Sequence, residues 1–128
     1  MSDLYELNMR LIQASDDLTT ALEALNAQVQ AFARAEHQYR SAKARGFLAV
    51  VGAKNVAERE ALAESSISPD PITGEALTLG DLRYRRDLAE GLKLSALEAV
   101  RSRRGQLSAV QTLASLSKAE AEFARTGP

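Results

Sequence analysis

The sequence predicts an all-α fold: a long antiparallel helical hairpin with a short intervening helix, which assembles into an oligomeric helical bundle. The first 45 residues contain neither glycine nor proline. Apolar residues recur there with a seven-residue spacing, and the same spacing returns after residue 79. This spacing is typical of long helices that pack side by side.

The first long helix is expected over residues 3–45. One heptad position holds only large residues, whereas the position three residues further on is mostly alanine. Leu22 and Val29 widen the apolar stripe beyond a two-position seam, which suits a bundle of several helices. Gly46 is the expected C-terminal cap of this helix. The large residues of the row are Leu4, Leu11, Leu18, Leu25, Phe32 and Tyr39.

A short helix is expected over residues 55–65, with Asn55 as its N-cap. Residues 66–78 contain two prolines, a glycine and several small polar residues, so they are expected to form a loop. Thr78 followed three residues later by Asp81 resembles a capping box, and it predicts the start of a second long helix over 79–123.

Gly91 and Gly105 lie inside the second long helix, where each costs about 1 kcal/mol relative to alanine. The second helix is therefore expected to bend more than the first. We expect residues 1–128 to form one helical domain. An isolated hairpin with an alanine-rich core leaves apolar flanks exposed, so the leucine-rich row of the first helix predicts a homo-oligomer.

The formal net charge is only −1, but the charges are segregated along the chain. Residues 1–30 carry one cation and five anions, and residues 31–59 carry six cations and two anions. Residues 60–82 carry five anions and no cation, and residues 83–104 carry seven cations and three anions. Blocks of this kind create oriented electric fields even when the total charge is near zero.

The sequence contains no legible catalytic or metal-binding motif. There is no cysteine, and His37 is the only histidine, so the usual zinc ligand sets cannot form. Gly46 and Gly52 are wrongly spaced for a phosphate-binding loop, and no lysine followed by serine or threonine comes after them. We expect a protein that is not an enzyme and needs no cofactor. No apolar run is long enough to span a membrane and none resembles a secretion signal, so a cytoplasmic location is expected.

Clustered basic residues are the strongest functional signal. In an antiparallel hairpin, the end of the first helix lies beside the start of the second. The cations there, with Tyr39 and Tyr84 nearby, predict a surface that binds phosphates and stacks bases. The alternative is that these cations form ion pairs along the helix surface with Glu36, Asp87, Glu90 and Glu98. The predicted DNA-binding residues are Arg40, Lys43, Arg45, Lys54, Arg59, Arg83, Arg85, Arg86, Arg101, Arg103 and Arg104.

Two runs resemble a known family. Residues 39–45 read YRSAKAR, and residues 97–115 read LEAVRSRRGQLSAVQTLAS. Their order and the chain length are similar to those of the UvsY-type recombination mediators of bacteriophages. The family's Lys-Ala-Arg run corresponds here to residues 43–45. Its late Ala-Ile-Lys-Ser-Arg series corresponds to residues 99–103. The proline-containing loop at 66–78 and the acidic stretch at 60–66 depart from the family pattern.

The resemblance implies a helical oligomer that binds single-stranded DNA and helps a RecA-like recombinase displace single-strand-binding protein in the cytoplasm of a bacterial host. A helical oligomeric adaptor or scaffold, whose basic faces bind acidic proteins, is the alternative. A phage inhibitor of a host nuclease or defence complex is a third interpretation.

Overall fold

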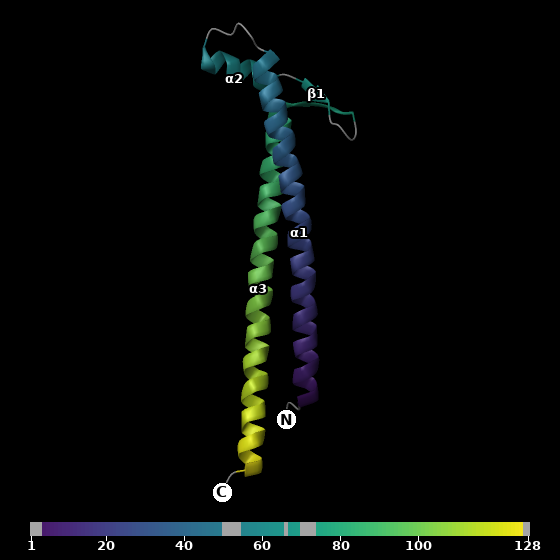
Figure 1. Ribbon diagram of the computed structural model, residues 1–128, viewed down its shortest axis with the longest axis vertical. Helices are drawn as coiled ribbons and strands as arrows, with labels where there is room; N and C mark the ends of the chain where they lie inside the picture. Colours follow the sequence, from purple (N-terminus) through teal and green to yellow (C-terminus); the bar gives the residue numbers. More distant parts are fainter. Residues whose placement is uncertain (1–3, 50–54, 66, 70–73, 127–128) are drawn as a thin grey trace. The chain divides into compact units, whose positions relative to one another are not determined.

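The computed structural model describes residues 4–49, 55–65, 67–69 and 74–126 (Figure 1). Two long helices, α1 (Leu4–Ala49) and α3 (Leu79–Thr126), are linked through the short helix α2 (Val56–Ser65) and two short strands. The prediction of two long helices with a short helix between them is confirmed. Lys54 lies outside the described residues.

Helix α1 begins at Leu4 and continues without interruption to Ala49. It does not end at Gly46, so the expected C-terminal cap is wrong. Gly46 is buried inside the last turns of the helix. The helix gains another turn because Phe47, two residues before the new end, packs partly buried against a cluster of buried side chains. The packing of that apolar side chain outweighs the weak helix propensity of one glycine.

Helix α2 begins as the sequence predicts. The Asn55 side-chain oxygen accepts a hydrogen bond of 2.7 Å from the backbone N–H of Glu58. A bond from an Asn side chain to the third residue of a helix satisfies a donor that would otherwise have no partner. The N-cap assigned to Asn55 is therefore confirmed.

The segment predicted as a loop contains two strands, β1 (Ile67–Pro69) and β2 (Ala76–Thr78). They pair antiparallel, with Ile67 opposite Thr78 and Pro69 opposite Ala76. Gly74 has a φ of 72°, which a side chain would disfavour, in the connection before β2. The hairpin leads directly into α3, and its Leu77 is buried.

The capping box predicted at the start of α3 is present. The backbone N–H of Asp81 donates to the Thr78 hydroxyl over 3.1 Å, and the backbone N–H of Thr78 donates to the Asp81 carboxylate over 3.0 Å. The two residues satisfy each other's donors at the exposed end of the helix. From there α3 runs through Gly91 and Gly105 to Thr126 as one continuous helix.

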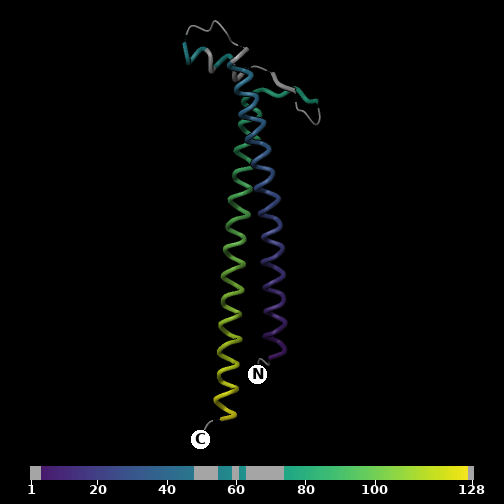
Figure 2. Tube along the Cα trace, in the orientation of Figure 1, coloured from purple at the N-terminus to yellow at the C-terminus, as the bar shows by residue number. Residues whose placement is uncertain are grey.

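The chain divides into two compact units, each containing part of α1 and part of α3. Unit 1 comprises residues 1–26 and 94–128, and unit 2 comprises residues 27–93. In unit 1, Leu7, Val100 and Val110 are buried, and Val100 is only 1% exposed. The Cα trace in Figure 2 shows the first part of α1 beside the last part of α3 within this unit.

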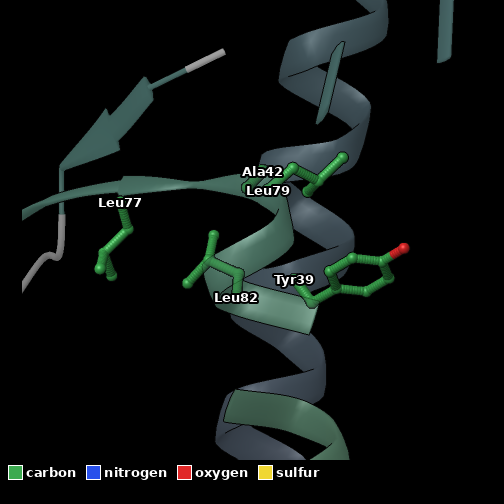
Figure 3. Close-up of a cluster of buried hydrophobic side chains, with 5 residues drawn as sticks. All are labelled: Tyr39, Ala42, Leu77, Leu79 and Leu82. Carbon is green, nitrogen blue, oxygen red and sulfur yellow. The ribbon is translucent and has the colours of Figure 1, made fainter. Parts of the chain in front are cut away.

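Unit 2 contains the densest group of buried side chains, which we call the tyrosine core. It joins α1, β2 and the first turn of α3 (Figure 3). The contribution of Leu77 fixes the hairpin against the helices. Tyr39 is the largest member, and its ring is 6% exposed. The members of the tyrosine core are Tyr39, Ala42, Leu77, Leu79 and Leu82.

Candidate nucleic-acid interface

Three cations surround the Tyr39 ring in unit 2, and we call them the cationic cluster: Lys43, Arg83 and Arg86. The Arg86 guanidinium lies 4.5 Å from the ring centroid, the Arg83 guanidinium lies 5.8 Å from it, and the Lys43 ammonium lies 6.0 Å from it. Arg83 also donates a hydrogen bond of 3.3 Å from Nε to the Tyr39 hydroxyl. The antiparallel course of α1 and α3 in unit 2 brings the cluster together from residues that are about forty positions apart in the sequence.

A similar contact between a cation and an aromatic ring lies seven residues from Tyr39 along α1 and seven residues from Arg86 along α3. The Lys93 ammonium is 4.2 Å from the centroid of the Phe32 ring. Phe32 and Tyr39 share one heptad row of α1, and Lys93 and Arg86 share one row of α3. Lys93 is missing from the predicted binding residues. The sequence does contain a signal for this contact: Arg86 and Lys93 interrupt an otherwise apolar row, and they are seven residues apart, as the two aromatic rings are.

These contacts restrict what the tyrosines can do. Tyr39 is buried in the tyrosine core and covered by cations, so it offers no free face to a nucleic-acid base. Tyr84 is 68% exposed, and its ring is accessible. Of the two tyrosines predicted to stack bases, the geometry allows that role for Tyr84 alone.

Several basic side chains form ion pairs, as the alternative interpretation predicts. Arg40 contacts Glu36 over 2.9 Å, and Arg86 contacts Asp87 over 3.0 Å. Arg85 contacts Glu75, the residue before β2, over 3.2 Å. The carboxylates in these pairs are between 31% and 61% exposed. Exposed pairs contribute between about zero and 1 kcal/mol, so an anionic ligand can compete for these cations.

Lys43 is partnered differently. Its side chain is exposed, and its contacts are with the Tyr39 and Phe47 rings, the latter over 5.8 Å. A ring holds an ammonium in place through its negative face without neutralising the charge. Lys43 therefore presents a positioned positive charge at the surface of unit 2.

The start of α3 holds the arginines of the cluster in a fixed register. Hydrogen bonds from Thr78, the backbone bond first and the side-chain bond second, lower the pKa of Asp81 below its ordinary value. Desolvation opposes this lowering of the Asp81 pKa, and the charge of Arg85 adds a smaller lowering effect. The ionised carboxylate keeps the first turn formed, and Arg83 and Arg86 follow in the next residues.

The predicted DNA-binding residues do not form one surface within a single unit. Arg101, Arg103 and Arg104 belong to unit 1, where Arg101 pairs with Glu98 and Arg103 approaches Asp17 at 3.9 Å. The remaining described ones belong to unit 2. Arg45 is exposed near the end of α1. Arg59 lies in α2, but its side chain is outside the described set.

The residues of the row predicted to mediate oligomerisation are buried to different extents in the two units. Tyr39 is buried and Phe32 half-buried within unit 2. In unit 1, Leu4 is 52% exposed, and the next three leucines of the row, Leu11, Leu18 and Leu25, are half-buried.

Among the described residues, no group of three or more His, Asp or Glu side chains is placed to hold a metal ion. His37 is exposed on α1. None of the helices, as far as they are described, combines the length and the apolar character that crossing a membrane requires.

Comparison of the chain with family models, with curated proteins and with solved structures finds no match. The resemblance to UvsY-type mediators therefore stays a prediction that depends on residues 39–45 and 97–115.

Proposed function

We propose that the protein is a non-enzymatic accessory protein that binds single-stranded DNA through the cationic cluster of unit 2. The observation that carries this proposal is the convergence of Lys43, Arg83 and Arg86 on one buried ring. Flexible cations would lose side-chain entropy on binding, whereas cations already held against a ring lose less. An ordered set of positive charges suits the regularly spaced phosphates of a nucleic acid.

The preference for single strands follows from Tyr84. Its ring is exposed, and it lies one residue from Arg83 and two from Arg86. An unpaired base can stack on such a ring, which contributes about 1–3 kcal/mol per base, whereas bases inside a duplex are not available. Phosphate contacts and one stacking residue would bind strands of any sequence.

More specifically, we propose that the protein acts as a recombination mediator. The resemblance supports a homo-oligomer that acts beside a RecA-like recombinase and single-strand-binding protein in a bacterial cytoplasm. A protein that hands DNA from one partner to another needs weak, exchangeable phosphate contacts. The exposed ion pairs of Arg40 and Arg85 suit that requirement because they are individually weak.

A helical adaptor that binds acidic proteins is the second candidate. The ion pairs support it, because Arg40, Arg86 and Arg101 each contact a neighbouring carboxylate as a solvated helix surface would. Exposed apolar side chains on α3, among them Leu116 at 57% and Phe123 at 72%, also suit a protein partner. Binding to DNA separates the two candidates.

The test is fluorescence anisotropy with labelled single-stranded and double-stranded DNA. The wild type should bind both and prefer the single strand. Lys43→Ala with Arg83→Ala should weaken binding to every sequence, and Tyr84→Ala should weaken binding to single strands only. Arg10→Ala with Arg103→Ala, two exposed cations of unit 1, is the matched control with the same change of charge. A wild type that binds neither DNA, or a control that loses as much affinity as the unit 2 variant, would overturn the proposal.

A further inference from the structure

The α3 residues that lie against the heptad row of α1 differ in kind between the two units. In unit 2, Lys93 and Arg86 of α3 cover the rings of Phe32 and Tyr39. In unit 1, the α3 residues on the same row are Val100, Leu107 and Ala114, and none of them carries a cation. The α1 leucines of unit 1 therefore lack the charged cover that the rings have in unit 2.

The row, in which Leu11, Leu18 and Leu25 are half-buried, borders a flank of unit 1 that has exposed apolar side chains, which we call the leucine face. Next to the row, Ile12 is 55% exposed and Leu22 is 40% exposed. An open groove follows this flank between the two helices, and it is lined by Leu11, Ile12, Ser15, Asp16, Leu107 and Gln111. Exposed apolar side chains beside a groove of mixed polar and apolar lining are typical of an interaction site.

The charges along the leucine face are distributed unequally between the helices. On α1, the two heptad positions that follow the leucine row on this flank carry no charge in unit 1: Tyr5, Asn8, Ile12, Ser15, Thr19, Leu22 and Asn26. On α3, the corresponding positions hold one anion, Glu122, and four cations, Arg101, Arg104, Lys118 and Arg125, all exposed. A second copy that laid α3 on α3 would place these cations opposite one another, which is unfavourable.

Packing α1 of one copy on α3 of the other avoids this repulsion and adds an attraction between opposite charges. Ala14 and Val110 line the same groove on the other flank, so these two positions are level along unit 1. Nine residues further along each antiparallel helix, Glu23 is level with Arg101. If α1 lies on α3 of a second copy in the same register, the exposed Glu23 of one copy comes close to Arg104 of the other and to Arg101, which also contacts Glu98 of its own chain.

We propose that unit 1 dimerises through the leucine face about a two-fold axis parallel to its helices, with α1 of each copy packed on α3 of the other. The homo-oligomer is part of the proposed function, but this interface does not depend on DNA binding. We infer that the partner is a second copy because the leucine face contains two complementary strips. The α1 strip is uncharged and has an acidic edge, and the α3 strip has a basic edge. A two-fold interface requires such self-complementarity.

The first experiment measures mass by sedimentation velocity and light scattering at micromolar concentration. The wild type should be a dimer or a larger even-numbered oligomer. Leu22→Lys and Ile12→Glu should each weaken dimerisation more than about tenfold, because each buries a charge in the interface and the lysine also lies opposite Arg101 and Arg104 of the other copy. Circular dichroism should show unchanged helix content, since both side chains are largely exposed in the single chain.

Leu113→Glu is the matched control, because Leu113 is similarly exposed at 43% and lines the groove on the other flank. It should leave the mass unchanged. A monomeric wild type would overturn the dimer, and dissociation by Leu113→Glu but not by Ile12→Glu would overturn the choice of face. Both results are independent of the anisotropy experiment.

Charge reversal tests the arrangement. Glu23→Arg and Arg104→Glu should each weaken dimerisation by about two- to fivefold, the range of an exposed ion pair. The double variant should recover most of the loss, because the pair is restored with its signs exchanged. If the double variant is as weak as the sum of the single variants, α1 does not lie on α3 of the partner copy.

Discussion

Arg86→Ala should destabilise unit 2, because the arginine covers the Tyr39 ring. Its guanidinium lies 4.5 Å from the ring centroid. Cation–π contacts contribute about 0.5–1 kcal/mol at exposed sites and about 2 kcal/mol when desolvated. The Arg86 side chain is 28% exposed and the tyrosine 6% exposed, so the contact belongs in the upper part of that range. With the loss of packing by the arginine stem, the expected cost is about 2 kcal/mol.

The assay is thermal and urea unfolding followed by circular dichroism. For a chain of this length, a loss of about 2 kcal/mol lowers the melting temperature by roughly 5–10 °C. Arg101→Ala is the control: it also replaces an α3 arginine by alanine, so the change in helix propensity cancels. The Arg101 side chain is 63% exposed and its only described partner is Glu98, so its loss should cost less than about 0.5 kcal/mol. Equal destabilisation by the two variants would refute the reasoning.

Substitutions at Thr78, Gly91 and Gly105 test local features of α3. Thr78→Ala should cost about 1 kcal/mol in urea unfolding, and Thr78→Ser should cost less; equal losses would exclude the hydroxyl as the cap. The folded-state pKa of Asp81 is lowered, so its stabilisation should be complete above the ordinary carboxyl pKa and disappear as pH falls through the lowered value. Melting curves below about pH 4 should therefore differ less between the wild type and Thr78→Ala than at neutral pH, and a constant difference would contradict the assignment. Gly91→Ala and Gly105→Ala should each stabilise the protein by about 1 kcal/mol, because an added Cβ meets no atom within 4 Å. Lower stability of either alanine variant in urea would contradict that prediction.

Features determined by neighbouring residues could be predicted from the sequence. The capping box of Thr78 and Asp81 and the N-cap Asn55 need only a spacing of three residues, and both are present. The seven-residue rows predicted both long helices for the same reason, since the side chains that share a helix face are set by the helical period.

Features determined by tertiary packing could not be predicted from the sequence. The strands β1 and β2 have three residues each, and β1 ends in Pro69, so propensity alone indicates a loop. Their pairing is favoured because Leu77 enters the tyrosine core, which no local pattern reveals. The continuation of α1 past Gly46 has the same origin in Phe47.

The candidate site was predicted only in part. Its location at the end of α1 and the start of α3 followed from the hairpin, and Lys43, Arg83 and Arg86 do come together there. The role of Tyr39 depended on burial, and the contact of Lys93 with Phe32 depended on the register between the helices. Neither quantity can be obtained from the spacing within one helix.

The central claim is that the cationic cluster binds the phosphates of single-stranded DNA. The most direct measurement is the affinity for a labelled single strand at a series of salt concentrations, for the wild type and for Lys43→Ala with Arg83→Ala. Each phosphate contact contributes about 0.7 to the slope of log K against log salt for single strands, so the variant should lose about 1.4. Wild-type binding with an equal slope in the variant would contradict the account, because the cations of the cluster would then contact no phosphate.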